Sequence, residues 1–177
     1  ILVSSNLERL LYLMSGDAAL VAELMAQLKE KGVYQVPDAL LEKIQSVFWS
    51  GCCDDDATKA AIGRLWKEHH YLADTHTAVA WQVAQDYKAA CAGHNPVVVL
   101  STASPYKFPA AVLEGLGEGS DGDGFDAMER LHALTGVPVP ANLQGLRQRE
   151  VLHRDVIDRE DMLSYVLKKA GEAVWSK

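Results

Sequence analysis

Residues 97–109, VVVLSTASPYKFP, are the most informative segment of this 177-residue chain. They begin with four consecutive aliphatic residues, a run typical of a strand buried on both faces of a parallel sheet. Three hydroxyl side chains follow directly, on Ser101, Thr102 and Ser104. Because α/β proteins bind ligands beyond the carboxyl ends of such strands, these hydroxyls are candidate ligand contacts. A capped loop between a strand and a helix would account for the same residues without any ligand.

A second segment, LADTHTAVA at residues 72–80, predicts the start of a helix. Asp74 or Thr75 is a suitable N-cap, and apolar residues recur at helical spacing as far as Tyr87. His76 falls on this stripe, which is expected to face inward, and lies in the first turn, where free N–H groups favour an anion. A core histidine hydrogen-bonded to a neighbour would explain His76 equally well.

Together with LVSSNLERLL at residues 2–11, these two segments resemble threonine synthase, the pyridoxal-phosphate enzyme that makes threonine from O-phosphohomoserine. The three stretches occur in the order found in that family. The pattern around His76 also resembles the wider fold-type-II pyridoxal-phosphate family, which includes tryptophan synthase β. Many relatives have proline where this chain has Thr75, and phenylalanine where it has Leu7.

The resemblance implies that residues 1–177 are the C-terminal portion of such an enzyme. A helical elaboration is expected at about residues 15–70, and a cofactor-facing strand and loop at about 97–109. The Schiff-base lysine and the cofactor-phosphate loop belong to upstream segments of the family, so the catalytic lysine is expected outside this chain. The chain is therefore expected to be inactive alone and to need the upstream part of the same enzyme as its partner.

The resemblance also implies a chemistry. The intact enzyme, a carbon–oxygen lyase acting on phosphates, would convert O-phospho-L-homoserine and water to L-threonine and phosphate in threonine biosynthesis. The pyridine nitrogen of pyridoxal phosphate faces a hydroxyl in fold-type-II enzymes, and Ser101 and Thr102 are the candidates for binding it. Candidates for binding the substrate or its phosphate are Asn6, Arg9, His76, Thr77, Ser104 and Lys107. A surface ion pair with Glu8 would also account for Arg9, and projection into solvent for Lys107.

Composition excludes several other functions. The net charge of −7 argues against nucleic acid and against an anionic membrane surface, and no apolar run has the length of a membrane span. Three cysteines, an odd number with two adjacent, form a poor disulfide framework and predict a cytoplasmic protein. Their spacing relative to the histidines fits no zinc pattern, so no metal is expected.

The predicted fold class is α/β: a helix-rich fragment with a small parallel sheet, part of a fold-type-II enzyme. No domain boundary stronger than the loop near Gly122 is expected. A standalone, non-catalytic helical interaction domain is the alternative. Helices are expected at residues 5–14, 17–32, 38–49, 54–70, 75–93, 108–115, 125–136 and 158–171.

Overall fold

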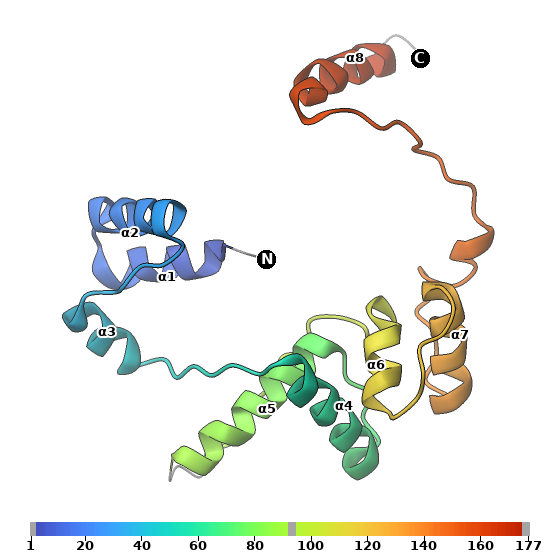
Figure 1. Cartoon of the computed structure of the whole chain (residues 1–177), viewed down its shortest axis with the longest axis horizontal. Helices are drawn as coiled ribbons and strands as arrows, with labels where there is room; N and C mark the ends of the chain where they lie inside the picture. The colour runs from blue at the N-terminus through green and yellow to red at the C-terminus, as the bar shows by residue number, and fades with distance from the viewer. Residues whose placement is uncertain (1–2, 92–94, 175–177) are drawn as a thin grey trace. The chain divides into compact units, whose positions relative to one another are not determined.

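A computed structural model describes residues 3–91 and 95–174, and every regular element within them is helical (Figure 1). The chain divides into two compact units, residues 1–135 and 136–177. The division therefore follows the seventh helix and does not fall at the loop near Gly122. The α-helices are α1 (Ser5–Ser15), α2 (Ala18–Lys31), α3 (Asp38–Gln45), α4 (Asp55–His69), α5 (Thr75–Ala90), α6 (Pro109–Gly115), α7 (Gly124–Thr135) and α8 (Met162–Val174). Short 3₁₀ turns are η1 (Pro105–Lys107), η2 (Leu146–Gln148) and η3 (Arg159–Asp161).

The predicted starts of α1, α2, α4 and α5 are confirmed. The side chains of Asp17, Asp54 and Asp74 each accept hydrogen bonds from backbone N–H groups in the first turn of α2, α4 and α5. Ser4 does the same for α1. These bonds satisfy N–H groups that a helix start otherwise leaves without partners, so local sequence is enough to specify where the helices begin.

Two helix boundaries differ from the predictions by four residues. Helix α3 ends at Gln45 instead of continuing to Trp49, and the Trp49 ring lies 5.6 Å from that of Tyr87 on α5. Residues 47–49 thus lie outside the helix, and Trp49 contacts α5. Helix α8 begins at Met162, after a 3₁₀ turn, and not directly after Asp158. The predicted end of α5 near Gly93 lies outside the described residues.

Helices α1, α2 and α3 share one small core. It is built from Leu11, Val21, Leu24 and Leu40, with partly buried side chains such as Met14 and Ile44 packed against them. Each helix contributes its apolar stripe, so this core follows from the helical spacing of the sequence.

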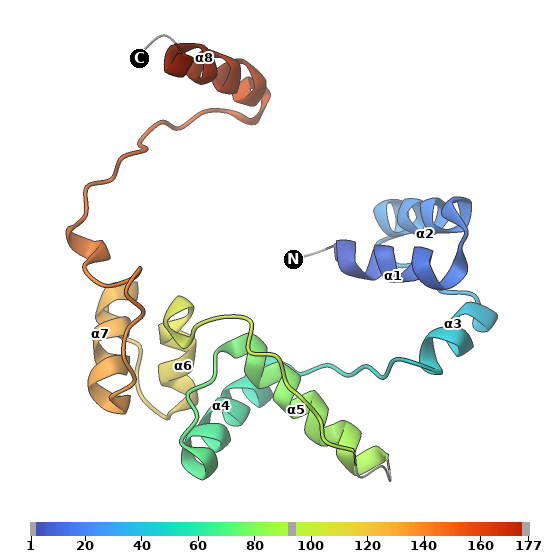
Figure 2. The same ribbon diagram turned by 180° about the vertical axis from the view of Figure 1, so that it is seen from behind.

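Helices α4 to α7 form a second group. Helix α4 contacts both α5 and α6, and α6 contacts α7 (Figures 1 and 2). Two glycines allow α4 and α6 to approach closely, because a Cβ on Gly63 would lie 2.5 Å from the carbonyl oxygen of Gly115. The buried side chains of α4, α6 and α7 include Ile62, Val112 and Leu131. This packing fixes the start of α5 and the residues that precede α6.

The predicted parallel sheet is wrong for the part of the chain that the structure describes. Residues 97–100 carry no regular structure, and Val98 and Leu100 are 81% and 72% exposed. A strand exists only when neighbouring backbone supplies hydrogen-bond partners, and residues 3–91 and 95–174 contain no strand that could do so. An apolar run alone does not form a strand, because a sheet also requires neighbouring strands to pair with it.

The second unit is described by itself. The Tyr165 hydroxyl on α8 donates a 2.7 Å hydrogen bond to Asp155, and the Lys169 ammonium lies 3.4 Å from the same carboxylate. The pKa of the Asp155 carboxyl is lowered, first by the Tyr165 hydrogen bond and then by Lys169. Among the described helices of both units, none is long and apolar enough to cross a membrane.

Candidate functional site

Asp74 organises the start of α5. Its side chain is fully buried, and Oδ1 accepts hydrogen bonds from the backbone N–H groups of His76 at 2.9 Å and Thr77 at 3.2 Å. Its other carboxylate oxygen, Oδ2, accepts a short hydrogen bond from the Thr77 hydroxyl. A buried carboxylate with this many donors is well compensated for the loss of water. The sequence predicted Asp74 only as a cap and missed its bond to the Thr77 side chain, three residues along.

Thr77 joins the two segments that the sequence singled out. Its Oγ1 lies 3.2 Å from Oγ of Ser101, within hydrogen-bond distance. Thr77 is buried, whereas Ser101 is exposed. Residues 24 positions apart in the chain therefore meet, and the start of α5 carries the beginning of the 101–109 segment beside it.

A second contact between the same segments lies nearby. The rings of His76 and Phe108 have centroids 5.5 Å apart, and the Lys107 ammonium lies 6.0 Å from the Phe108 ring centre. Three of the predicted site residues, His76, Thr77 and Ser101, are thus brought together at the start of α5. Lys107 is linked to them by its contact with Phe108. Phe108 was not among the residues predicted for the site.

The predicted environment of His76 is wrong. Its side chain is 61% exposed, and the residues of α5 that are buried are Thr77 and Ala78. The helix is therefore rotated relative to the apolar stripe that was expected to face inward. The N–H groups expected to hold an external anion are also bonded to the Asp74 carboxylate, which supplies that negative charge from within the chain.

The remaining hydroxyls have different environments. Ser104 accepts a 3.3 Å hydrogen bond from the backbone N–H of Tyr106 and so caps the 3₁₀ turn η1. Thr102 is exposed, and its hydroxyl bonds to no other residue among 3–91 and 95–174. Thr102 therefore has a hydroxyl that can both donate and accept.

Asn6 and Arg9 lie in the other helix group, on α1. The Arg9 guanidinium donates a short hydrogen bond to the Asn6 side chain. This pairing replaces the Glu8 ion pair considered from the sequence. Among the described residues, neither Asn6 nor Arg9 is hydrogen-bonded to Thr77 or Ser101. Their assignment to the substrate stays a prediction.

A hollow of about 470 Å³ adjoins His76. Its lining includes Lys59 on α4 and Glu114 on α6, which form an ion pair of 2.7 Å. The hydrogen bond between these two side chains raises the pKa of Lys59 and lowers that of Glu114. Because each charge already has its counter-ion, this hollow has no surplus positive charge for a phosphate.

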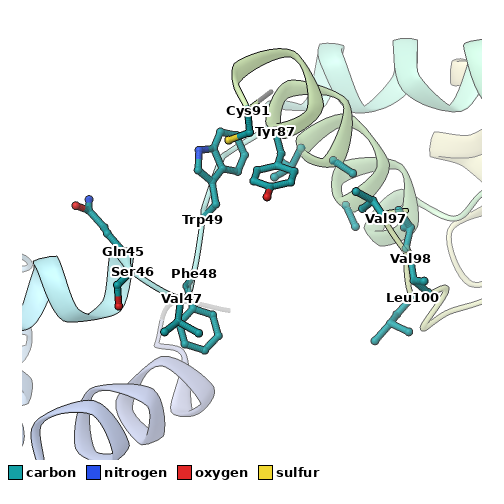
Figure 3. A pocket seen from close by; sticks show the side chains of 14 residues that line it. Gln45, Ser46, Val47, Phe48, Trp49, Tyr87, Cys91, Val97, Val98 and Leu100 are labelled. Carbon is teal, nitrogen blue, oxygen red and sulfur yellow. The ribbon is translucent and has the colours of Figure 1, made fainter. Parts of the chain in front are cut away.

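A larger, open hollow of about 700 Å³ lies along the other face of α5 (Figure 3). The hollow is lined by Val47, Phe48 and Trp49, together with Tyr87 and residues 97–100. The stripe of α5 predicted to face the core faces this hollow instead. Its lining combines aliphatic and aromatic side chains with the polar side chains of Gln45, Ser46 and Cys91.

The arrangement at the start of α5 suits one kind of ligand group. Its exposed polar side chains include the hydroxyls of Ser101 and Thr102 and the imidazole of His76, whereas the Asp74 carboxylate is buried behind Thr77. A neutral hydroxyl can donate to an unprotonated ring nitrogen, which a carboxylate cannot do. Ser101 and Thr102 therefore present neutral groups that can donate to such a nitrogen.

Comparisons with known proteins identify the family to which this chain is similar. A family model described as threonine synthase, C-terminal, matches residues 77–163. Threonine synthase-like 1 of Macaca fascicularis is 39% identical over 117 residues, which cover 66% of this chain and 15% of that protein. Threonine synthase of Pseudomonas aeruginosa is 35% identical over 120 residues, covering 67% and 25%.

A solved structure is also similar. The crystal structure of threonine synthase from Brucella melitensis, with pyridoxal phosphate bound, superimposes with a TM-score of 0.59 at 38% identity. The match covers 72% of this chain and 27% of that one. The protein class is thus that of threonine synthases and threonine synthase-like proteins. Within that class, this chain corresponds to the C-terminal region, and it spans about 15 to 25% of the length of the relatives compared. This relationship favours an enzyme family over a standalone interaction domain.

Proposed function

We propose that this chain forms the C-terminal portion of a threonine synthase that converts O-phospho-L-homoserine and water to L-threonine and phosphate. The observation that carries the proposal is the Thr77–Ser101 hydrogen bond, which joins the two segments most similar to that family. The similarity to a threonine synthase with bound pyridoxal phosphate supports it. When bound, pyridoxal phosphate supplies the electron sink for such chemistry, and the protein positions it.

Within this proposal the two exposed hydroxyls have different roles. Ser101 is engaged with Thr77, whereas Thr102 has its proton available. Thr102 is therefore the better donor to the cofactor's ring nitrogen, and Ser101 holds the loop. We also assign binding of the substrate phosphate to His76 and Lys107, which both contact Phe108 at the same end of α5. The Schiff-base lysine comes from the part of the enzyme that precedes this region.

The proposal can be tested with a chimaera. The C-terminal region of Pseudomonas aeruginosa threonine synthase is replaced by this chain, and phosphate release from O-phosphohomoserine is measured with and without pyridoxal phosphate. We expect release that depends on the cofactor, and none from the 177-residue chain alone. Replacing Thr102 by alanine should lower kcat by about 10- to 100-fold, the loss expected for one hydrogen bond to a cofactor in a shielded site.

The control separates folding from function. Thr75→Val changes a neighbouring threonine whose place is taken by proline in many relatives, and it should leave the rate within about 2-fold, since surface substitutions cost little. A chimaera that folds and binds pyridoxal phosphate but releases no phosphate would contradict the proposal. Turnover by the isolated chain would contradict the assignment of the lysine to another segment.

A further inference from the structure

The start of α5 contains a chain of three hydrogen-bonded side chains with a fixed direction. A hydroxyl has one proton to donate, and an ionised carboxylate has none. The Thr77 proton goes to Asp74, because the carboxylate can only accept. The hydrogen bond between Thr77 and Ser101 must then use the Ser101 proton. The buried charge of Asp74 therefore orients the exposed hydroxyl of Ser101 through Thr77.

Burial makes this orientation firm. The Asp74 side chain has no exposed surface and Thr77 is 4% exposed, so water does not compete for either group. Two backbone N–H groups hold Asp74 in place at the same time. Hydrogen bonds to a charged acceptor are stronger than those between neutral groups, and a chain of them is mutually polarised. Ser101, although exposed, thus has a defined position, and its hydroxyl proton is used in the hydrogen bond to Thr77.

We propose that Asp74 and Thr77 are positioning residues that act through Ser101, and that they hold the 101–104 loop in the arrangement the cofactor ring requires. This inference rests on the proposed function. Its consequence is that Ser101 presents only acceptor lone pairs toward the site. The donor to the ring nitrogen must then come from the next residue, Thr102, whose place in the loop is set by the anchoring of Ser101.

The first test uses the chain itself. Thr77→Val and Ser101→Ala are made singly and together, and the folding equilibrium is measured by urea denaturation. Each single change should lower the folding equilibrium constant by about 2- to 10-fold, and the double change should cost less than the product of the two. Thr77→Ser, which keeps the hydroxyl, should restore the coupling with Ser101. Thr75→Val is the matched control and should show no coupling. Independent effects of Thr77→Val and Ser101→Ala would overturn the inference.

A second measurement does not depend on the buried substitution. Ser101 is exposed, so Ser101→Ala should fold, and NMR chemical shifts report its effect on Thr77, Asp74 and Thr102. We expect changes at Thr77 and Asp74 as well as in the loop. Changes confined to residues 100–102 would overturn the chain of hydrogen bonds.

The chimaera separates this inference from the proposed function. Thr77→Val should shift the visible absorption of the bound cofactor and lower kcat by about 10-fold or more with KM nearly unchanged, and Thr77→Ser should restore both. If the unsubstituted chimaera is inactive, the proposed function fails. If it is active and Thr77→Val has the same spectrum and rate, only the positioning role fails.

Discussion

At the scale of single residues, burial determines the chemistry of this protein more than residue type does. Asp74 and Asp54 are both helix caps, yet only Asp74 is also bonded to a side chain that reaches another segment. His76 shows the reverse, since it was predicted to be inward and is 61% exposed. The sequence singled out Asp74 and His76, but their exposure depends on how α5 is rotated against α4.

Tyr106 provides a prediction at this scale. Burial raises the pKa of its phenol, and a hydrogen bond with Thr135 partly opposes this. A folded-state pKa above the unfolded value means that the contribution to stability is complete below the unfolded pKa of about 10 and is lost as the pH rises through the folded value. Urea midpoints measured between pH 8 and 11 should therefore fall more steeply for the unsubstituted chain than for Tyr106→Phe. Parallel curves for the two proteins would contradict this.

At the scale of elements, helix ends and helix contacts have different origins. The ends of α1, α2, α4 and α5 follow from capping residues that lie within the same few residues of sequence. The contact between α4 and α6 depends instead on two glycines far apart in the chain. Nothing local distinguishes Gly63 from a glycine that merely weakens a helix, so its role was not predictable.

Gly63→Ala tests that contact. Alanine improves the helix propensity of α4 by about 1 kcal/mol, but its Cβ would lie 2.5 Å from the Gly115 carbonyl oxygen. Overpacking of this kind costs about 1–3 kcal/mol, so we expect a net loss of up to about 2 kcal/mol in the free energy of unfolding. Thermal and urea denaturation measure it. Gly124→Ala is the control, because a Cβ there meets nothing within 4 Å, and it should not destabilise. Equal stability of the two variants would rule out the close approach.

At the scale of the whole molecule, the chain consists of two compact units, residues 1–135 and 136–177. From the sequence no boundary stronger than the loop near Gly122 was expected, yet the division follows Thr135. That loop is held to the first unit by an ion pair of 2.8 Å between Glu118 and Arg130 on α7. The glycines predict a turn in this loop. The contacts of α7 with α6 show that α7 belongs to the first unit.

Limited proteolysis tests this division. Residues 149–158 carry no regular structure and are exposed, and they include Arg149 and Arg154. Proteases cut preferentially in such segments, so trypsin at low ratio should cut there first and release a fragment that retains residues 1–135. Mass spectrometry identifies the cut, and circular dichroism of the larger fragment should remain helical. Replacing both arginines by glutamine should slow the first cut. A first cut within α4 to α7 would contradict the division.

The sequence by itself determined the helices, because caps, glycine stops and apolar periodicity act over three or four residues. It also predicted that residues 72–80 and 97–109 belong together, through a resemblance that the comparisons bear out at the level of the family. Only the tertiary structure decided that residues 97–100 are unpaired and that Thr77 meets Ser101. The physical reason is that strand pairing and hydrogen bonds between segments depend on distant partners. The packing of α4 against α5 and α6 brings such partners together, and no local pattern encodes it.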